Sequence, residues 1–271
     1  MSTQTEIKNE WLQIALNAAH EAGQVILEIY ESGDFDVEIK GDNSPLTRAD
    51  RASHEVIMRH LATTDIPVLS EEGREMPYAE RRDWERLWIV DPIDGTKEFI
   101  KRNGEFTVNI ALVDGGQPVL GVIYVPVSGE FYVGSAVAGA FKSVIPATAS
   151  CPDVEAFVAS ADTLPRPKGD RSFTVVASRS HMSPETADYI ASCQAEHGEV
   201  ATISKGSSLK LCMVAEGLAD CYPRFAPTME WDTAAGHAIC TAAGFDVIDQ
   251  QTQRTMTYNR ENLLNNWFLV R

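Results

Sequence analysis

Apolar residues near the start of the chain recur at helical spacing. Within residues 15–29 they form one stripe, which consists of Ala15, Ala18, Ala22, Val25, Ile26 and Ile29. A period near 3.6 residues predicts an amphipathic helix with one face against a core. After a stretch with Gly and Pro at residues 40–45, we expect a second helix around residues 47–61, in which Thr47 and Asp50 have the spacing of a capping box.

Short apolar runs with strand character follow, and the first two lead to acidic residues. Residues 67–69 precede Glu71 and Glu72, and residues 87–90 precede Asp91. Runs this apolar indicate buried strands, which would deliver the acids at their carboxyl ends. An antiparallel meander is then expected over residues 107–113, 119–125 and 131–133, with a turn at 114–116.

The second half of the chain alternates strands with helices. Strands are expected at residues 174–177, 219–222, 245–248 and 267–270. Helices are expected after Ser183-Pro184, near Ser207 or Ser208, and over residues 233–243, with Gly244 as a terminator. Residues 146–170 mix Pro, Ser, Asp and Gly, so we place a junction there. The predicted parts are an N-terminal α+β portion, residues 1–145, and a C-terminal α/β portion, residues 146–271.

The composition narrows the class of function. The 271 residues are 44% hydrophobic, which is enough for one large globular unit or two joined halves. A formal net charge of −16 argues against polymeric DNA or RNA as a partner, because such proteins need a basic face to displace counterions. An acidic protein that handles an anionic substrate needs bound cations instead.

Cysteine and histidine usage gives no disulfide or zinc pattern. The five cysteines are widely spread without a CxxC pair, as expected for free thiols in a reducing compartment. The six histidines lack metal-ligand spacing such as HExxH. The first ten residues are polar and acidic, unlike a signal peptide, and no segment approaches the roughly 20 apolar residues of a membrane span. These features predict a cytoplasmic protein without integral membrane segments.

An acidic constellation is the candidate site. Asp91 and Asp94 flank Pro92-Ile93 after an apolar strand, and two carboxylates this close repel each other unless a cation lies between them. The proline fixes the turn, so we expect both carboxylates and the Ile93 carbonyl to converge. Oxygen ligands of this kind suit Mg²⁺. Gly95-Thr96 follows, with backbone N–H groups that would bind a phosphate.

Each acid also has a purely structural interpretation. The alternatives are a solvated turn for Asp91 and Asp94, an exposed loop for Glu71 and Glu72, a helix N-cap for Asp232, and a capping box for Asp50. Spacing alone does not decide between these roles and a metal site.

Four segments in family order resemble the signatures of the inositol monophosphatase superfamily, and they span nearly the whole chain. They are Ser44-Pro-Leu-Thr-Arg-Ala-Asp50, Leu69-Ser-Glu-Glu-Gly73, Trp88-Ile-Val-Asp-Pro-Ile-Asp-Gly-Thr96 and Trp231-Asp-Thr-Ala-Ala-Gly-His237. Within that superfamily the chain resembles the CysQ type of 3'(2'),5'-bisphosphate nucleotidase. The segments that carry this second resemblance are Thr96-Lys-Glu-Phe99, Ser178-Arg-Ser-His181, Lys205-Gly-Ser-Ser-Leu-Lys210 and Tyr222-Pro-Arg-Phe225.

The resemblance implies a fold and a reaction. The implied fold is a layered αβαβα sandwich, with the metal site between the two portions. The implied reaction is Mg²⁺-dependent, Li⁺-sensitive removal of the 3'-phosphate from adenosine 3',5'-bisphosphate, which leaves AMP. Two Mg²⁺ ions are implied, with a third, looser ion allowed near Glu71.

The resemblance also assigns roles to residues. The first Mg²⁺ would be held by Glu71, Asp91 and the Ile93 carbonyl, and the second by Asp91, Asp94 and Asp232. The catalytic residues would be Asp50 and Thr96, which position and help deprotonate the attacking water, together with Glu71. The hydrolysed phosphate would contact Ile93, Asp94, Gly95, Thr96 and Asp232.

A second phosphate and the ribose need further groups. Gly206, Ser207 and Lys210, at the start of a helix, would bind them with Ser178, His181 and Arg224. Lys210 also fits an ordinary solvated lysine, and His181 fits a helix-capping histidine. His237 lies on an apolar helix face, which indicates a core position.

Several interpretations stay open on the sequence. The acidic cluster does not separate this activity from that of an inositol monophosphatase or fructose 1,6-bisphosphatase of the same fold. A rival of another class is a catalytically silent metal- or nucleotide-binding protein. The expected partner is a small phosphorylated nucleotide, and a homodimer is compatible with the resemblance. Peripheral membrane association is suggested for some relatives, but a charge of −16 works against binding to anionic lipids.

Overall fold

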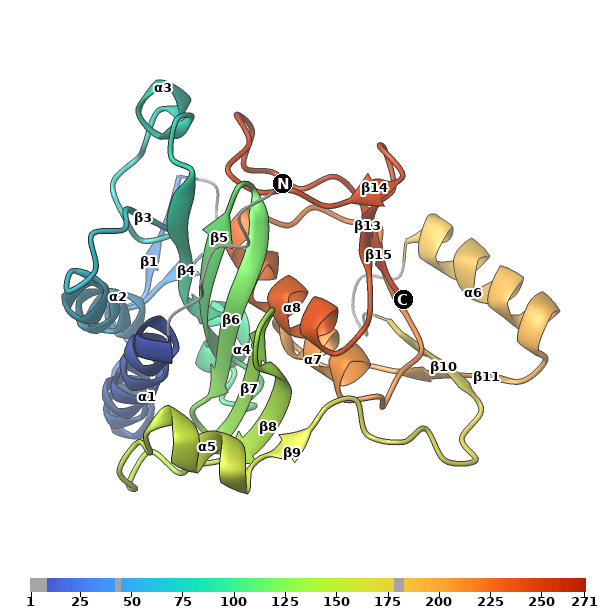
Figure 1. The fold of residues 1–271 in the computed structure, drawn as a ribbon, viewed down its shortest axis with the longest axis horizontal. Helices are drawn as coiled ribbons and strands as arrows, with labels where there is room; N and C mark the ends of the chain where they lie inside the picture. The colour runs from blue at the N-terminus through green and yellow to red at the C-terminus, as the bar shows by residue number, and fades with distance from the viewer. Residues whose placement is uncertain (1–8, 42–44, 178–182) are drawn as a thin grey trace.

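A computed structural model describes residues 9–41, 45–177 and 183–271, which form five stacked layers (Figure 1). The first layer consists of helices α1 (Asn9–Ser32) and α2 (Arg48–Leu61), with α5 (Val154–Ser160) beside α1. Helix α1 buries Ala15, Ala18, Ala22 and Ile26, so the predicted stripe is confirmed. Helix α2 has Thr47 as its N-cap and a capping box with Asp50, as predicted.

The second layer is a seven-stranded sheet in which every neighbouring pair except the first is antiparallel. Its strands, in spatial order, are β3 (Val68–Ser70), β4 (Arg86–Asp94), β5 (Thr107–Asp114), β6 (Gln117–Val125), β7 (Glu130–Ser135), β8 (Gly139–Val144) and β9 (Asp162–Thr163). The predicted meander is confirmed and continues into β8 and β9. Because β9 pairs with β8, the sheet draws on residues beyond 145, and the division at that point stays a prediction.

The third layer is formed by α7 (Leu209–Ala215) and α8 (Glu230–Ala242), which cover the opposite face of the sheet. Two glycines permit the close approach of α8 to β6 and β7. A Cβ atom at Gly121 would lie 2.3 Å from the Ala235 carbonyl oxygen, and one at Gly134 would lie 2.4 Å from Ile239 Cα. Helix α8 begins three residues before the predicted start, so Asp232 lies inside its first turn rather than at the N-cap.

The outer layers belong to the C-terminal half. A four-stranded sheet, in the order β12-β15-β13-β14, consists of β12 (Tyr222–Arg224), β13 (Val247–Asp249), β14 (Arg254–Thr255) and β15 (Phe268–Val270). The parallel pair β10 (Phe173–Val176) and β11 (Val200–Ile203) adjoins it, and α6 (Pro184–His197), capped by Ser183 as predicted, is outermost. In Figure 1 the order of layers across the molecule is helices, sheet, helices, sheet and helix, which confirms the αβαβα sandwich.

Strand β4 positions the acidic segment differently from the prediction. The expected strand ends before Asp91, whereas β4 continues to Asp94. Its pairing with β5 is irregular there, because Asp91 is opposite Asn109 and Asp94 is opposite Thr107. Between these two pairs, β4 has two residues and β5 has one, which is a bulge of the kind that redirects side chains near active sites.

The remaining elements are short connections. They are the hairpin β1 (Glu38–Ile39) and β2 (Pro45–Leu46), and the helices α3 (Tyr78–Arg81) and α4 (Thr96–Ile100). Within the described ranges, no helix has the length and apolar character needed to cross a membrane. All five cysteines are free, as expected.

Candidate metal and phosphate site

The predicted acids come from four elements that meet at the carboxyl end of β4. Asp50 lies on α2, Glu71 follows β3, Asp91 and Asp94 lie on β4, and Asp232 lies on α8. Asp91 is only 1% exposed, and burial raises its pKa well above the usual range, with the charges of the other four acids acting in the same direction. The five carboxylates therefore share one electrostatic site with surplus negative charge.

Asp50 and Thr96, to which the resemblance assigns a joint role on the attacking water, contact each other. The Thr96 hydroxyl lies 3.3 Å from Asp50 Oδ1 and 3.4 Å from the Ile93 carbonyl oxygen. The other oxygen of Asp50 accepts hydrogen bonds from the backbone N–H and hydroxyl of Thr47. Burial raises the pKa of Asp50, although the bonds from Thr47 oppose this shift. One carboxylate oxygen of Asp50 thus forms the capping box, and the other faces the site.

Gly95 makes the turn from β4 into α4. Its φ of +94° lies in the left-handed region, which favours glycine. A Cβ atom there would also lie 3.2 Å from the Glu105 carbonyl oxygen and 3.3 Å from Ser207 Cβ. The glycine therefore allows the segment that carries Ser207 to approach the end of β4.

Two serines from the C-terminal half bind Asp94. The hydroxyl of Ser207 lies 2.8 Å from Asp94 Oδ2, and that of Ser208 lies 2.6 Å from the same oxygen. The Ser208 hydroxyl also lies 2.7 Å from the carbonyl oxygen of Asp232. These contacts join β4 to the first turn of α8. Burial, followed by the charge of Asp94, raises the pKa of Asp232 to about 8.

A lysine that the sequence did not single out lies among the acids. The Lys40 ammonium is 3.0 Å from Glu71 Oε1 and also pairs with Glu72. Burial disfavours the charged form of Lys40, but the charges of both glutamates outweigh burial and raise its pKa. Lys40 is thus an internal cation at the place where the resemblance implies a metal ligand.

The described side chains do not form a finished ligand set. Over residues 9–41, 45–177 and 183–271, no three Asp, Glu, His or Cys side chains are grouped closely enough to hold one ion. Instead the acids bind protein groups: Glu71 binds Lys40, Asp94 binds the two serines, and Asp232 accepts from the Met229 backbone N–H at 2.8 Å. The donors are nevertheless all oxygen atoms with excess negative charge, a chemistry that fits Mg²⁺.

A cavity of about 460 Å³ adjoins Asp94 and Asp232. Of the predicted phosphate-binding groups, those that line it are Gly95, Gly206, Ser207, Lys210 and Arg224. The Lys210 ammonium donates to the Ser207 carbonyl oxygen at 2.9 Å, and burial lowers its pKa. Glu71 lines a neighbouring cavity of about 420 Å³ instead. Predicted residues Ser178 and His181 lie outside the described residues.

Sequence reasoning missed several residues of this site. Besides Lys40, they include Thr107 and Asn109 on β5, which contact the two serines. One signal was available, because these are the two polar positions of an otherwise apolar run, two residues apart and thus on one face of a strand. Lys97, Lys101 and Lys205 line the cavity as well. His237 is buried, as predicted, and beside Tyr258.

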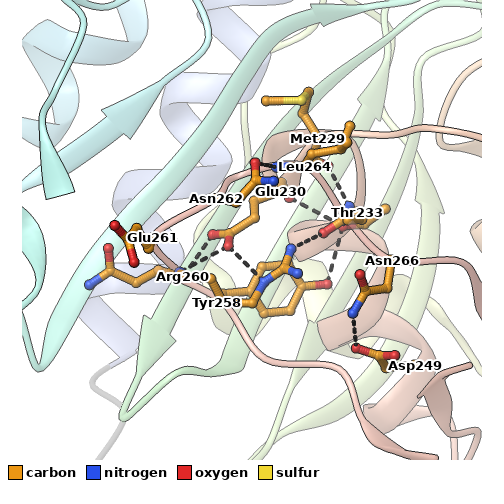
Figure 2. Close-up of polar contacts among 12 residues, drawn as sticks. Met229, Glu230, Thr233, Asp249, Tyr258, Arg260, Glu261, Asn262, Leu264 and Asn266 are labelled. Carbon is orange, nitrogen blue, oxygen red and sulfur yellow. Dashed lines mark hydrogen bonds and ion pairs between the residues drawn. The ribbon is translucent and has the colours of Figure 1, made fainter. Parts of the chain in front are cut away.

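A buried ion pair fastens the first turn of α8, which carries Asp232 (Figure 2). Glu230 is fully buried and accepts hydrogen bonds from the backbone N–H groups of Asn259 and Arg260. The Arg260 side chain pairs with the same carboxylate at 3.1 Å and binds Asn265. Asn265 in turn donates to the Met229 carbonyl oxygen. The segment 258–265 thereby holds the start of the helix in place.

Comparisons with known proteins identify the family and agree with the fold. The model of the inositol monophosphatase family matches residues 7–268. A Shigella flexneri protein named 3'(2'),5'-bisphosphate nucleotidase CysQ is 48% identical over 256 residues, which cover 93% of this chain and 96% of the relative. A protein of the same name from Salmonella typhimurium is 47% identical and covers 96% of this chain and 98% of its own length.

Solved structures give the same result. The crystal structure of CysQ from Bacteroides thetaiotaomicron, described as a bacterial member of the inositol monophosphatase family, is 54% identical, with a TM-score of 0.87 and 95% coverage of both chains. The suhB protein of Bartonella henselae, at 24% identity, a TM-score of 0.72 and coverage of 96% of this chain and 93% of its own, supports the fold alone. This chain belongs to the inositol monophosphatase family.

Proposed function

We propose that this protein is a Mg²⁺-dependent 3'(2'),5'-bisphosphate nucleotidase that removes the 3'-phosphate of adenosine 3',5'-bisphosphate. The observation that carries the proposal is the lining of the 460 Å³ cavity, where the acids Asp94 and Asp232 occur together with the basic residues Lys210 and Arg224. A substrate with two phosphates could place one phosphate beside the acids, bound through metal ions. The other phosphate would bind the basic residues directly. The relatives that are named 3'(2'),5'-bisphosphate nucleotidase support the same class of substrate.

The acids provide the metal site in this proposal. Glu71, Asp91 and the Ile93 carbonyl would hold one Mg²⁺, and Asp91, Asp94 and Asp232 would hold a second. When bound, Mg²⁺ supplies positive charge that polarises the phosphoryl group and makes water more acidic. Lys40 and a Mg²⁺ ion would both be attracted to the Glu71 carboxylate, of which Lys40 contacts Oε1.

Asp50 and Thr96 act on the attacking water. Because the Thr96 hydroxyl lies within reach of Asp50 Oδ1, a water that donates to Thr96 is also placed beside this carboxylate. One oxygen of Asp50 faces the site, so this carboxylate lies where it can accept a proton from that water. Backbone N–H groups of Gly95 and Thr96 would bind the phosphoryl oxygens as α4 begins.

The second phosphate would bind the cationic part of the cavity. Arg224 contributes a buried Nε for which no described residue provides an acceptor, so an anionic ligand would satisfy it. Lys210 lies in the same lining, and a bound phosphate would stabilise the charged form that burial disfavours. Gly206 and Ser207 would complete this part of the site.

Three finer points belong to the same proposal. We expect two Mg²⁺ ions, with a third, looser ion near Glu71, and equilibrium dialysis would count them. A cytoplasmic location follows from the free thiols, and fractionation of cells would test it. The mass in solution would test the expected homodimer.

The decisive experiment is Mg²⁺-dependent phosphate release from adenosine 3',5'-bisphosphate, inositol 1-phosphate and fructose 1,6-bisphosphate, measured side by side. A strong preference for the nucleotide supports the proposal. A preference for inositol phosphate would retain the metal chemistry and refute the substrate. Absence of release from all three substrates would refute both.

A further inference from the structure

Two polar side chains lie in the apolar main sheet directly opposite the acids of β4. Thr107 pairs with Asp94 and Asn109 pairs with Asp91 across the β4–β5 ladder. Thr107 is 0% exposed and Asn109 is 1% exposed. Buried polar groups require hydrogen-bond partners, so the partners of these two residues indicate their role. None of the roles assigned above uses either residue.

Their partners are the two serines that bind Asp94. The Asn109 amide nitrogen lies 2.9 Å from the Ser208 hydroxyl, and the Thr107 and Ser207 hydroxyls are 2.7 Å apart. Thr107 also lies 2.9 Å from Asn109 Oδ1, so these two acceptors, Asn109 Oδ1 and the Ser207 oxygen, compete for its one hydrogen; when Ser207 donates to Asp94, that hydrogen goes to Ser207. Each β5 residue therefore contacts one serine, and each serine contacts Asp94.

The chemistry of these groups gives the contacts a direction. An amide NH₂ only donates, so Ser208 accepts from Asn109 and keeps its own hydrogen for another acceptor. A carboxylate only accepts, so both serines donate to Asp94, and Ser208 gives its one hydrogen to the shorter of its two contacts, at 2.6 Å to Asp94 rather than 2.7 Å to the Asp232 carbonyl oxygen. Within the described part of the chain, the hydrogen bonds to the Asp94 side chain all go to Oδ2. The Oδ1 atom is thereby left for a cation.

We propose that Thr107 and Asn109 are positioning residues for Asp94, which they hold through the hydroxyls of Ser207 and Ser208 bound to Oδ2, so that Oδ1 would be available to a metal ion. This inference rests on the proposed function, since it takes Asp94 as a Mg²⁺ ligand. Groups that orient a metal ligand typically change metal affinity by about 10- to 100-fold when they are removed. The bonds also connect the two halves of the molecule at the reaction centre, since the serines precede α7.

A matched pair of variants at Thr107 tests the role of the hydroxyl. Thr107→Val keeps the shape and suits a strand, whereas Thr107→Ser keeps the hydroxyl. We expect Thr107→Val to weaken Mg²⁺ binding by about tenfold in titration calorimetry without substrate, and Thr107→Ser to bind nearly as well as the original protein. Asn109→Leu should weaken it similarly. Thr174→Val is the control, because this buried threonine of β10 donates to the Ser172 carbonyl oxygen, away from the site.

Kinetics and unfolding separate positioning from a general structural role. In Thr107→Val, excess Mg²⁺ should restore kcat while KM for the bisphosphate stays unchanged, and the unfolding temperature in EDTA should match that of Thr174→Val. Equal Mg²⁺ affinity in Thr107→Val, Thr107→Ser and the original protein would overturn the inference and leave the proposed function standing. If the original protein itself binds no Mg²⁺, both are refuted. If Asn109→Leu fails to fold, the Mg²⁺ affinities of Thr107→Val and Thr107→Ser still test the inference.

Discussion

Removal of Mg²⁺ should make the stability of this protein fall as pH rises from 6.5 to 8. Burial, with the neighbouring charge of Asp94, raises the pKa of Asp232 to about 8. In an unfolded chain an aspartate has a pKa of about 3.9. Over this window the metal-free folded protein therefore keeps a proton that the unfolded chain has released. Stability from such a raised carboxyl pKa is present at low pH and is lost as pH rises through the folded value.

The expected size follows from one proton. A difference of one bound proton changes the free energy of unfolding by about 1.4 kcal/mol per pH unit. From pH 6.5 to 8 the loss is about 2 kcal/mol, or roughly 4 °C in Tm for a chain of this length. We count one proton for Asp232 and Asp91 together, because Asp232 is partly exposed and the two acids interact. Below pH 6.5 His237, whose pKa burial lowers to about 3, acts in the opposite direction.

Thermal unfolding in EDTA at half-unit steps of pH is the assay. Saturating Mg²⁺ should abolish the fall, since the bound cation replaces the proton as the source of neutralising charge. Asp232→Asn should flatten the metal-free profile, because the amide mimics the protonated acid and can still accept from the Met229 N–H. A metal-free Tm that is constant or rising from pH 6.5 to 8 would refute the reasoning.

Three further outcomes are expected. Asp94→Asn should lower Mg²⁺-dependent turnover by at least about a hundredfold, because loss of a metal ligand reduces activity more than loss of a residue that orients the ligand. Near-normal phosphate release would contradict the role of Asp94 as a ligand. Lys210→Met should raise KM for adenosine 3',5'-bisphosphate at least about tenfold but leave that for adenosine 3'-phosphate nearly unchanged, with Lys168→Met as the control. Arg260→Met should leave Glu230 buried without its counter-ion and cost about 3–5 kcal/mol, measurable by denaturant unfolding.

The sequence by itself determined the local elements and the family. The stripe of α1, the capping box of Thr47 and Asp50, and the meander all follow from patterns within a few residues, and the structure confirms each. Such features are predictable because helix periodicity, capping and strand alternation act between near neighbours in the chain. The residues of the acidic motif could likewise be identified from the sequence, and their roles as metal ligands stay predictions.

Only the tertiary structure decided how those residues are held. Strand β4 extends through Asp94 because β5 pairs with it, a contact outside the reach of local propensity. Lys40 meets Glu71 across 31 positions, and Asn109 meets Ser208 across 99. Contacts of this kind depend on the packing of separate layers and leave no periodic signal along the chain. For that reason the acids could be identified from the sequence, whereas their partners from distant segments could not.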